Sequence, residues 1–131
     1  FGPPLAIACG DFNVVGEHGA GIPTDEYTSM LSCLGAPRDL YRELHPRATM
    51  PGYTWDGSTN RMIPRRDRDR HRLDYVFAWD RFPERHDDHD APPEVRPLDL
   101  ETISVERFET ADPMRCLSDH FAVSVDVRFD V

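Results

Sequence analysis

A carboxylate and a carboxamide stand two residues apart near the start of the chain, in the segment Gly10-Asp11-Phe12-Asn13. They follow a short apolar run at residues 5–9, which is typical of a buried strand. At the end of a strand, Asp11 could orient or deprotonate water, and Asn13 could donate hydrogen bonds to a charged oxygen. The alternative is an Asx-turn, in which both side chains bond only to nearby backbone.

A second carboxylate, Asp74, interrupts the otherwise apolar segment at residues 73–79. A buried carboxylate is costly unless it is paired or hydrogen-bonded, so Asp74 needs a partner. One alternative is a salt bridge with Arg72, its neighbour on the same strand face. The functional alternative is that Asp74 orients a histidine from elsewhere in the chain.

The third group is Ser118-Asp119-His120, directly before an alternating apolar segment at residues 121–129. His120 could act as an acid, a base or a charge stabiliser, and Asp119 could be an oxygen ligand for a hard cation. The alternative for this tripeptide is a capped turn that carries a surface histidine.

The elements that position these groups can be predicted from apolar periodicity. Strands are predicted at residues 5–9, 73–79, 102–108 and 121–129. A helix is predicted to begin after Thr24 as its N-cap and to end near Gly35, and residues 39–44 favour a further helical turn. These elements predict a mixed α/β (α+β) chain whose small sheet has one helical face and needs a cover on the other.

Two charged segments have both a structural and a functional interpretation. Residues 65–72 alternate Arg and Asp and could grip a phosphate, but we expect a solvated loop with internal Arg–Asp pairs. Residues 82–97 contain four prolines, two histidines and several aspartates. We expect an exposed acidic loop there and not a metal site, because metal ligation needs fixed geometry.

Together, the order GDFN, then RLDYVF, then SDH before an apolar strand resembles the endonuclease/exonuclease/phosphatase superfamily. This superfamily includes DNase-I-like nucleases, abasic-site endonucleases, neutral sphingomyelinases and inositol-phosphate phosphatases. Residues 52–56, with Asn60 beyond them, also resemble the stretch that precedes the LDY strand in these enzymes. The resemblance covers nearly the whole chain, from about Leu5 to Val127.

The resemblance implies a role for each matched residue. Asp11 matches the aspartate that positions or activates the attacking water, and Asn13 matches the asparagine that holds a phosphoryl oxygen. His120 matches the histidine that faces the scissile phosphate, and Asp74 matches the carboxylate that orients it. Asp119 matches a carboxylate near the metal, which is expected to be Mg²⁺ or Mn²⁺ in an oxygen-rich site without Cys ligands.

The resemblance also implies a fold. The family domain is a four-layer αββα sandwich of two similar halves, so residues 1–131 correspond to its C-terminal portion, a mostly antiparallel sheet with one or two helices. The earlier half carries a metal-binding glutamate, an asparagine and a further histidine, which have no counterpart here. We therefore expect a missing N-terminal half or a partner protomer to cover the sheet.

Composition limits the function further. The 131 residues carry a formal charge of −9, and all fifteen basic residues are arginines. The acidic balance argues weakly against attraction to nucleic acid but does not exclude it as a substrate, beside a lipid head group or a small phosphoester. Together with the resemblance of residues 52–60 and 72–77, it favours a sphingomyelinase-like or general phosphodiesterase over a sequence-specific nuclease. No apolar stretch approaches the length of a transmembrane helix. Three cysteines without a CxxC pair predict no disulfide framework, and we expect Cys9 and Cys33 to be buried thiols.

Two functions remain from these observations. The first is Mg²⁺-dependent hydrolysis of a phosphodiester by in-line attack of water, without a covalent enzyme intermediate. The second is a catalytically incomplete half-domain that assembles with a partner chain or with an N-terminal half.

Overall fold

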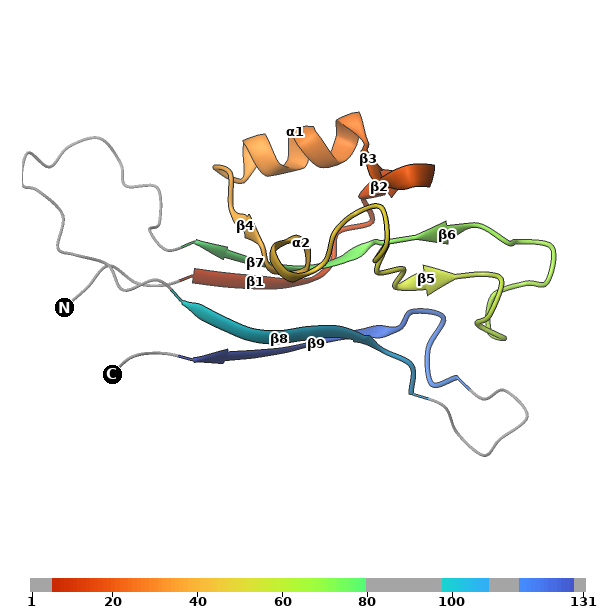
Figure 1. Ribbon diagram of the computed structural model, residues 1–131. Helices are drawn as coiled ribbons and strands as arrows, with labels where there is room; N and C mark the ends of the chain where they lie inside the picture. Colours follow the sequence, from red (N-terminus) through yellow and green to blue (C-terminus); the bar gives the residue numbers. More distant parts are fainter. Residues whose placement is uncertain (1–5, 80–97, 109–115, 129–131) are drawn as a thin grey trace, which may run out of the picture.

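A three-stranded antiparallel sheet in the order β1–β7–β4 forms the centre of the fold (Figure 1). The computed structural model describes residues 6–79, 98–108 and 116–128. The sheet strands are β1 (Ala6–Asp11), β7 (Asp74–Trp79) and β4 (Arg38–Asp39). β7 is the middle strand, so its alternate side chains are buried on both faces.

Helix α1 (Asp25–Cys33) covers one face of this sheet (Figure 1). Its start is confirmed by the Thr24 cap, whose Oγ1 accepts a hydrogen bond from the Tyr27 backbone N at 3.0 Å. It ends before Gly35, which has a φ of 76° as expected for a helix terminus. The apolar side of α1 packs on the aromatic face of β7.

A two-stranded hairpin of β8 (Asp99–Glu106) and β9 (Ala122–Arg128) lies on the opposite side of the sheet (Figure 1). The inward side chains of β9 are its alternating valines, as the sequence pattern predicts. The short helix α2 (Leu40–Leu44), capped by the Asp39 side chain, contributes to the same core. The buried residues of this core are Leu40, Tyr41, Val76, Ala78, Leu98 and Ile103.

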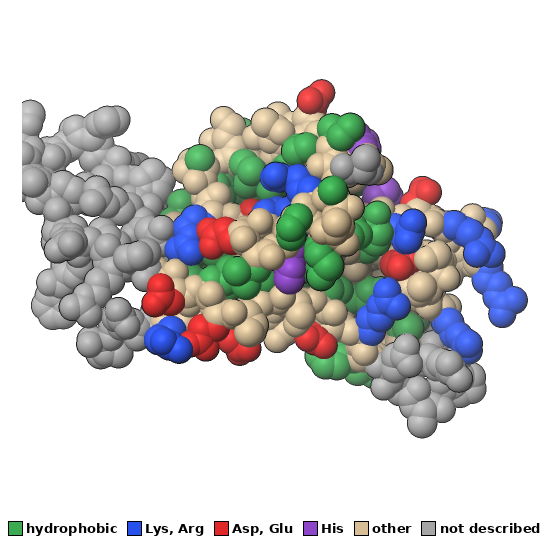
Figure 2. Space-filling view, viewed as in Figure 1, with side chains coloured by type: hydrophobic (Ala, Val, Ile, Leu, Met, Phe, Trp, Pro, Cys, Tyr) green, Lys and Arg blue, Asp and Glu red, His purple; other side chains and the backbone are tan. Residues whose placement is uncertain are grey.

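Four two-residue strands and a 3-10 turn complete the described fold. β2 (Glu17–His18) pairs with β3 (Ile22–Pro23) around the turn η1 (Gly19–Gly21). β5 (Trp55–Asp56) pairs with β6 (Arg70–His71), and the loop between them projects away from the body of the protein (Figure 1). Figure 2 shows Arg side chains gathered over this projecting end.

The expectation that the first strand is buried is wrong. Ile7 is 43% exposed and Cys9 is exposed, because β1 is the edge strand and the hairpin does not cover its outer part. Cys33 is also exposed, at the last turn of α1, so neither thiol is buried as predicted. The edge of β1 is thus an apolar surface that no other described strand pairs with.

The chain is of the mixed α/β (α+β) class, and every strand pairing among the described residues is antiparallel. The described parts form three layers, with α1, the central sheet and the hairpin in succession. Neither α1 nor α2 has the length and apolar character needed to cross a membrane. The predicted acidic loop at residues 82–97 lies outside the described residues.

Candidate active site

Asp11 and Asp74 lie directly opposite each other at one end of the central sheet. Asp11 is the last residue of β1 and Asp74 the first of β7, and they are partners in the antiparallel register. Directly paired residues project from the same face of a sheet, so both carboxylates emerge on one side. That face is the one covered further along by the hairpin.

His120 joins these two carboxylates from the segment that precedes β9. Its Nδ1 lies 2.8 Å from Asp74 Oδ2, and its Nε2 lies 4.0 Å from Asp11 Oδ2. The structure therefore brings together three predicted site residues, Asp11, Asp74 and His120, which we call the trio. Their ligand atoms all lie within 4.8 Å of one another.

The backbone around Thr54 holds the histidine against the aspartates. The Phe121 backbone N donates to the Thr54 carbonyl oxygen at 2.6 Å, and Trp55 forms an antiparallel bridge with His120. The Thr54 Oγ1, fully buried, accepts hydrogen bonds from the backbone N of Leu73 at 3.0 Å and of Asp74 at 3.1 Å. Thr54 was missed by the sequence analysis, although it lies in the segment that resembles the superfamily.

Asp11 forms the expected Asx-turn contact, but this is not its only interaction. Asp11 Oδ1 accepts a hydrogen bond from the Asn13 backbone N at 2.8 Å, while Oδ2 faces His120. One oxygen therefore fixes the carboxylate and the other is directed to the site. Asn13 has a φ of 52°, a left-handed conformation that asparagine tolerates, and it is exposed.

Asp119 lies at the rim of the site, outside the cluster of Asp11, Asp74 and His120. It is exposed, and its Oδ1 lies 3.4 Å from Ser118 Oγ, while Ser118 Oγ also accepts from the His120 backbone N at 3.1 Å. Asp119 lies in the turn that places His120. Its negative charge contributes to raising the pKa of His120.

The charges of the site act together on His120. Partial burial by itself lowers the pKa of its imidazole. The hydrogen bond to Asp74 and the negative charges of Asp74, Asp11 and Asp119 outweigh this effect and raise the pKa above its usual value of 6.5. His120 is therefore protonated over a wider pH range than an ordinary histidine.

A largely apolar pocket of about 230 Å³ adjoins His120 and Asp74. Its other lining residues are Phe108, Cys116, Leu117, Ser118, Phe121 and Ala122. Such a pocket could receive an apolar part of a ligand whose polar group lies at the trio.

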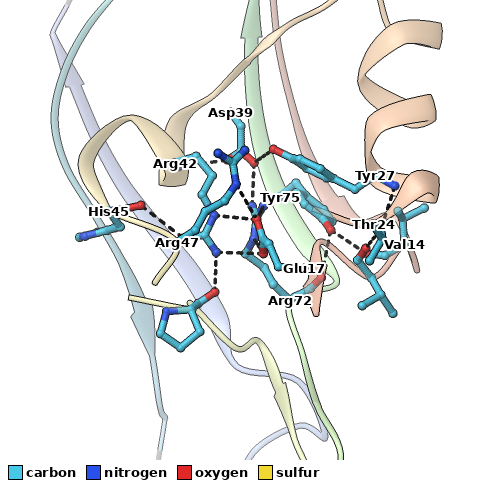
Figure 3. A network of polar contacts seen from close by, with 12 residues as sticks. Val14, Glu17, Thr24, Tyr27, Asp39, Arg42, His45, Arg47, Arg72 and Tyr75 are labelled. Carbon is cyan, nitrogen blue, oxygen red and sulfur yellow. Dashed lines mark hydrogen bonds and ion pairs between the residues drawn. The ribbon is translucent and has the colours of Figure 1, made fainter. Parts of the chain in front are cut away.

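A buried ion network surrounds Arg72, two residues before Asp74 (Figure 3). The Arg72 guanidinium is 2% exposed and donates to Asp39 Oδ2 at 2.8 Å and to Glu17 Oε1 at 3.0 Å. Glu17 also accepts from Arg42 Nε at 2.8 Å, and Asp39 accepts from the Tyr27 hydroxyl at 2.6 Å. The alternative in which Arg72 pairs with Asp74 is therefore wrong.

This network ties the loop after β1 to the start of β7. The Gly16 backbone N donates to the Arg72 carbonyl at 3.2 Å, and the Tyr75 hydroxyl donates to the Val14 carbonyl at 2.6 Å. A Cβ on Gly16 would lie 2.9 Å from that hydroxyl and 3.1 Å from Arg72 Nη2, so the close approach requires glycine. No local sequence pattern marks Glu17 as a partner of Arg72.

Comparison with known proteins adds one relative. The chain is 34% identical over 100 residues to an uncharacterized protein of Dictyostelium discoideum. The match covers 76% of this chain and 9% of the relative, so the chain spans a small part of that protein's length. No family model matches the sequence, and no solved structure matches it.

Proposed function

We propose that the chain provides catalytic residues for metal-dependent hydrolysis of a phosphodiester. The observation that carries this proposal is the convergence of His120 with Asp74 at 2.8 Å and Asp11 at 4.0 Å. Two carboxylates and an imidazole within 4.8 Å can orient water, accept its proton and offset phosphoryl charge. The superfamily resemblance of the three motifs supports the same chemistry.

In the proposed reaction, water attacks phosphorus as the bond to the leaving oxygen breaks, and no covalent enzyme intermediate forms. Asp11 accepts the proton of the water, and Asn13 donates to a phosphoryl oxygen from the adjoining turn. Asp74 holds the imidazole through Nδ1, which leaves Nε2 for the phosphate. The raised pKa of His120, caused by Asp74 and the other carboxylates despite partial burial, suits a cation that stabilises phosphoryl charge.

The residues also fit a hard divalent cation, Mg²⁺ or Mn²⁺. Asp11 has an exposed carboxylate beside Asp74, and Asp119 exposes another on the adjoining segment. Carboxylate oxygens are the ligands that these cations prefer. A bound cation would withdraw charge from the phosphoryl oxygens.

The test is hydrolysis of bis-p-nitrophenyl phosphate by the chain with Mg²⁺, with and without EDTA. We expect hydrolysis that EDTA abolishes and that His120→Gln lowers by roughly 10²–10⁴-fold, the range for loss of an acid–base group. His18→Gln, at an exposed histidine in β2, is the matched control and should retain the rate. Equal rates in both variants would exclude His120 from catalysis.

A second candidate function, a half-domain that assembles with a partner, is favoured by the exposed edge of β1. Ile7 and Cys9 project from the same face as Asp11, and both are exposed. An unpaired edge with apolar side chains is a surface on which another chain can pair. In this case the partner would cover the face beside the trio and complete the site.

A further inference from the structure

The segment that follows β5, up to and including β6, is positively charged, in contrast to the protein as a whole. We call residues 57–71 the arginine arm; it contains five arginines and two aspartates, a formal charge of +3 in a chain of −9. Figure 2 shows Arg side chains at the projecting end of the molecule, where Figure 1 places the loop between β5 and β6. A basic surface of this kind attracts phosphate groups.

Among the described residues, Arg65, Arg66 and Arg68 do not form the expected ion pairs with the neighbouring aspartates. Arg65, Arg66 and Arg68 are exposed, and none forms an ion pair within the parts of the chain that the structure describes. Asp67 Oδ1 instead accepts a hydrogen bond from the Asp69 backbone N at 3.2 Å. Three guanidinium groups are therefore available for a ligand.

The arm has a defined shape. The Gly57 backbone N donates to the Asp69 carbonyl at 2.9 Å, and Ile63 is 4% exposed at its base. The two sides approach so closely that a Cβ on Gly57 would lie 2.3 Å from the Asp67 carbonyl oxygen. The exposed arginines therefore project from a loop whose backbone conformation is fixed by these contacts.

The base of the arm is joined to the candidate active site. Trp55 pairs with His71 in the β5–β6 ladder and also bridges to His120. The Asn60 side-chain N donates to the Ser118 carbonyl at 2.8 Å, which ties the arm to the turn before His120. The base of the arm therefore adjoins the turn that places His120.

Aromatic rings line this base. The Trp55 and His71 rings stack with centroids 5.8 Å apart and an interplanar angle of 16°. The Arg70 guanidinium lies 5.0 Å from the centroid of the Tyr53 ring. Guanidinium groups beside flat aromatic faces are the combination that binds unpaired bases together with their phosphates.

We propose that the arginine arm binds a single strand of nucleic acid and leads it toward His120. The inference rests on the proposed function for its catalytic consequence, since it makes a nucleic-acid strand the substrate class of that site. Strand binding itself requires only the arm. The proposal thus assigns a nucleic-acid ligand to a protein whose net charge of −9 argues weakly against such a ligand.

The test is fluorescence anisotropy with a labelled single-stranded DNA oligonucleotide, in EDTA and over a range of salt concentrations. The oligonucleotide should exceed the roughly 4–16 nucleotides that one single-strand-binding module covers. We expect replacement of Arg65, Arg66 and Arg68 by Ala to weaken binding at least about tenfold. It should reduce the slope of log K against log salt by about 2, at roughly 0.7 for each lost phosphate contact. Arg128→Ala, in β9, is the control and should bind like the wild type.

The outcomes separate this inference from the proposed function. The triple variant should hydrolyse bis-p-nitrophenyl phosphate at the wild-type rate but lose activity on the oligonucleotide. Equal oligonucleotide affinity in wild type and triple variant would overturn the role of the arm. Tighter, arginine-dependent binding to phosphatidylserine–phosphatidylcholine vesicles than to the oligonucleotide would assign the arm to a membrane surface instead. Absence of hydrolysis with intact strand binding would refute only the proposed function.

Discussion

Arg72 and Asp74 lie two residues apart and belong to different polar systems. Arg72 bonds to Glu17 and Asp39 in the buried network, whereas Asp74 accepts its short contact from His120 at the site. Leu73 lies between them, and its backbone N, like that of Asp74, donates to Thr54. The start of β7 therefore contacts both the buried ion network and the more exposed candidate site.

The first prediction concerns the pKa of His120. Asp74→Asn keeps an oxygen that can accept from Nδ1 but removes the negative charge, so the pKa of His120 should fall. NMR titration of the histidine ring protons measures it directly. Asp126→Asn, which removes an exposed carboxylate on β9, is the charge-matched control and should leave the pKa unchanged. An unshifted His120 in Asp74→Asn would mean that the pair does not set its protonation.

The same pair makes stability depend on pH. Because the hydrogen bond and charge of Asp74 outweigh partial burial and raise the pKa of His120, its stabilisation is fully present below the unfolded value of 6.5. It is lost as pH rises through the folded-state pKa. Asp74→Asn should therefore destabilise the protein more on the acid side of neutrality than at alkaline pH.

The second prediction concerns the buried network. Arg72→Met leaves Asp39 without its buried cation and removes one of the three arginines that pair with Glu17, so it should lower the free energy of unfolding by about 3–5 kcal/mol. Arg68→Met, at an exposed arginine of the arm, should change it by no more than about 0.5 kcal/mol. Urea unfolding at neutral pH measures both. Similar values for the two variants would contradict a structural role for Arg72.

The free energy of unfolding lost in Arg72→Met should depend on pH. The direction should be opposite to that of the stabilisation by His120. Burial raises the pKa of Glu17, but the hydrogen bonds and charges of Arg42 and Arg72 outweigh it and lower the pKa below 4.5. This stabilisation is present above pH 4.5 and is lost as pH falls through the folded-state pKa. The difference between wild type and Arg72→Met should therefore shrink in acid.

The third prediction concerns the edge of β1. If this edge receives a partner strand, the isolated chain should self-associate as its concentration rises, which sedimentation velocity measures. Ile7→Lys should weaken the association, because a charge on an edge strand opposes pairing. Ile22→Lys, at a 61% exposed position in β3, is the control and should associate like the wild type. A wild-type chain that stays monomeric throughout would remove the support for the assembly proposal.

Local signals predicted much of the framework. The Thr24 cap and Gly35 terminus define α1, and alternation of Val123, Val125 and Val127 defines β9, since caps and periodicity act over a few residues. The exposure of the first strand could not be predicted from such local signals. An apolar run carries no information on whether its strand lies in the centre or at the edge of a sheet.

The sequence by itself determined which side chains are available for chemistry and that Asp74 required a polar partner. Tertiary structure decided that the partner is His120, 46 residues away, and that Arg72 turns instead to Glu17 and Asp39. Local rules reach only as far as a turn of helix or a strand pair. Partners from distant segments are chosen by how the sheet, hairpin and loops pack, because that packing alone sets the distances between them.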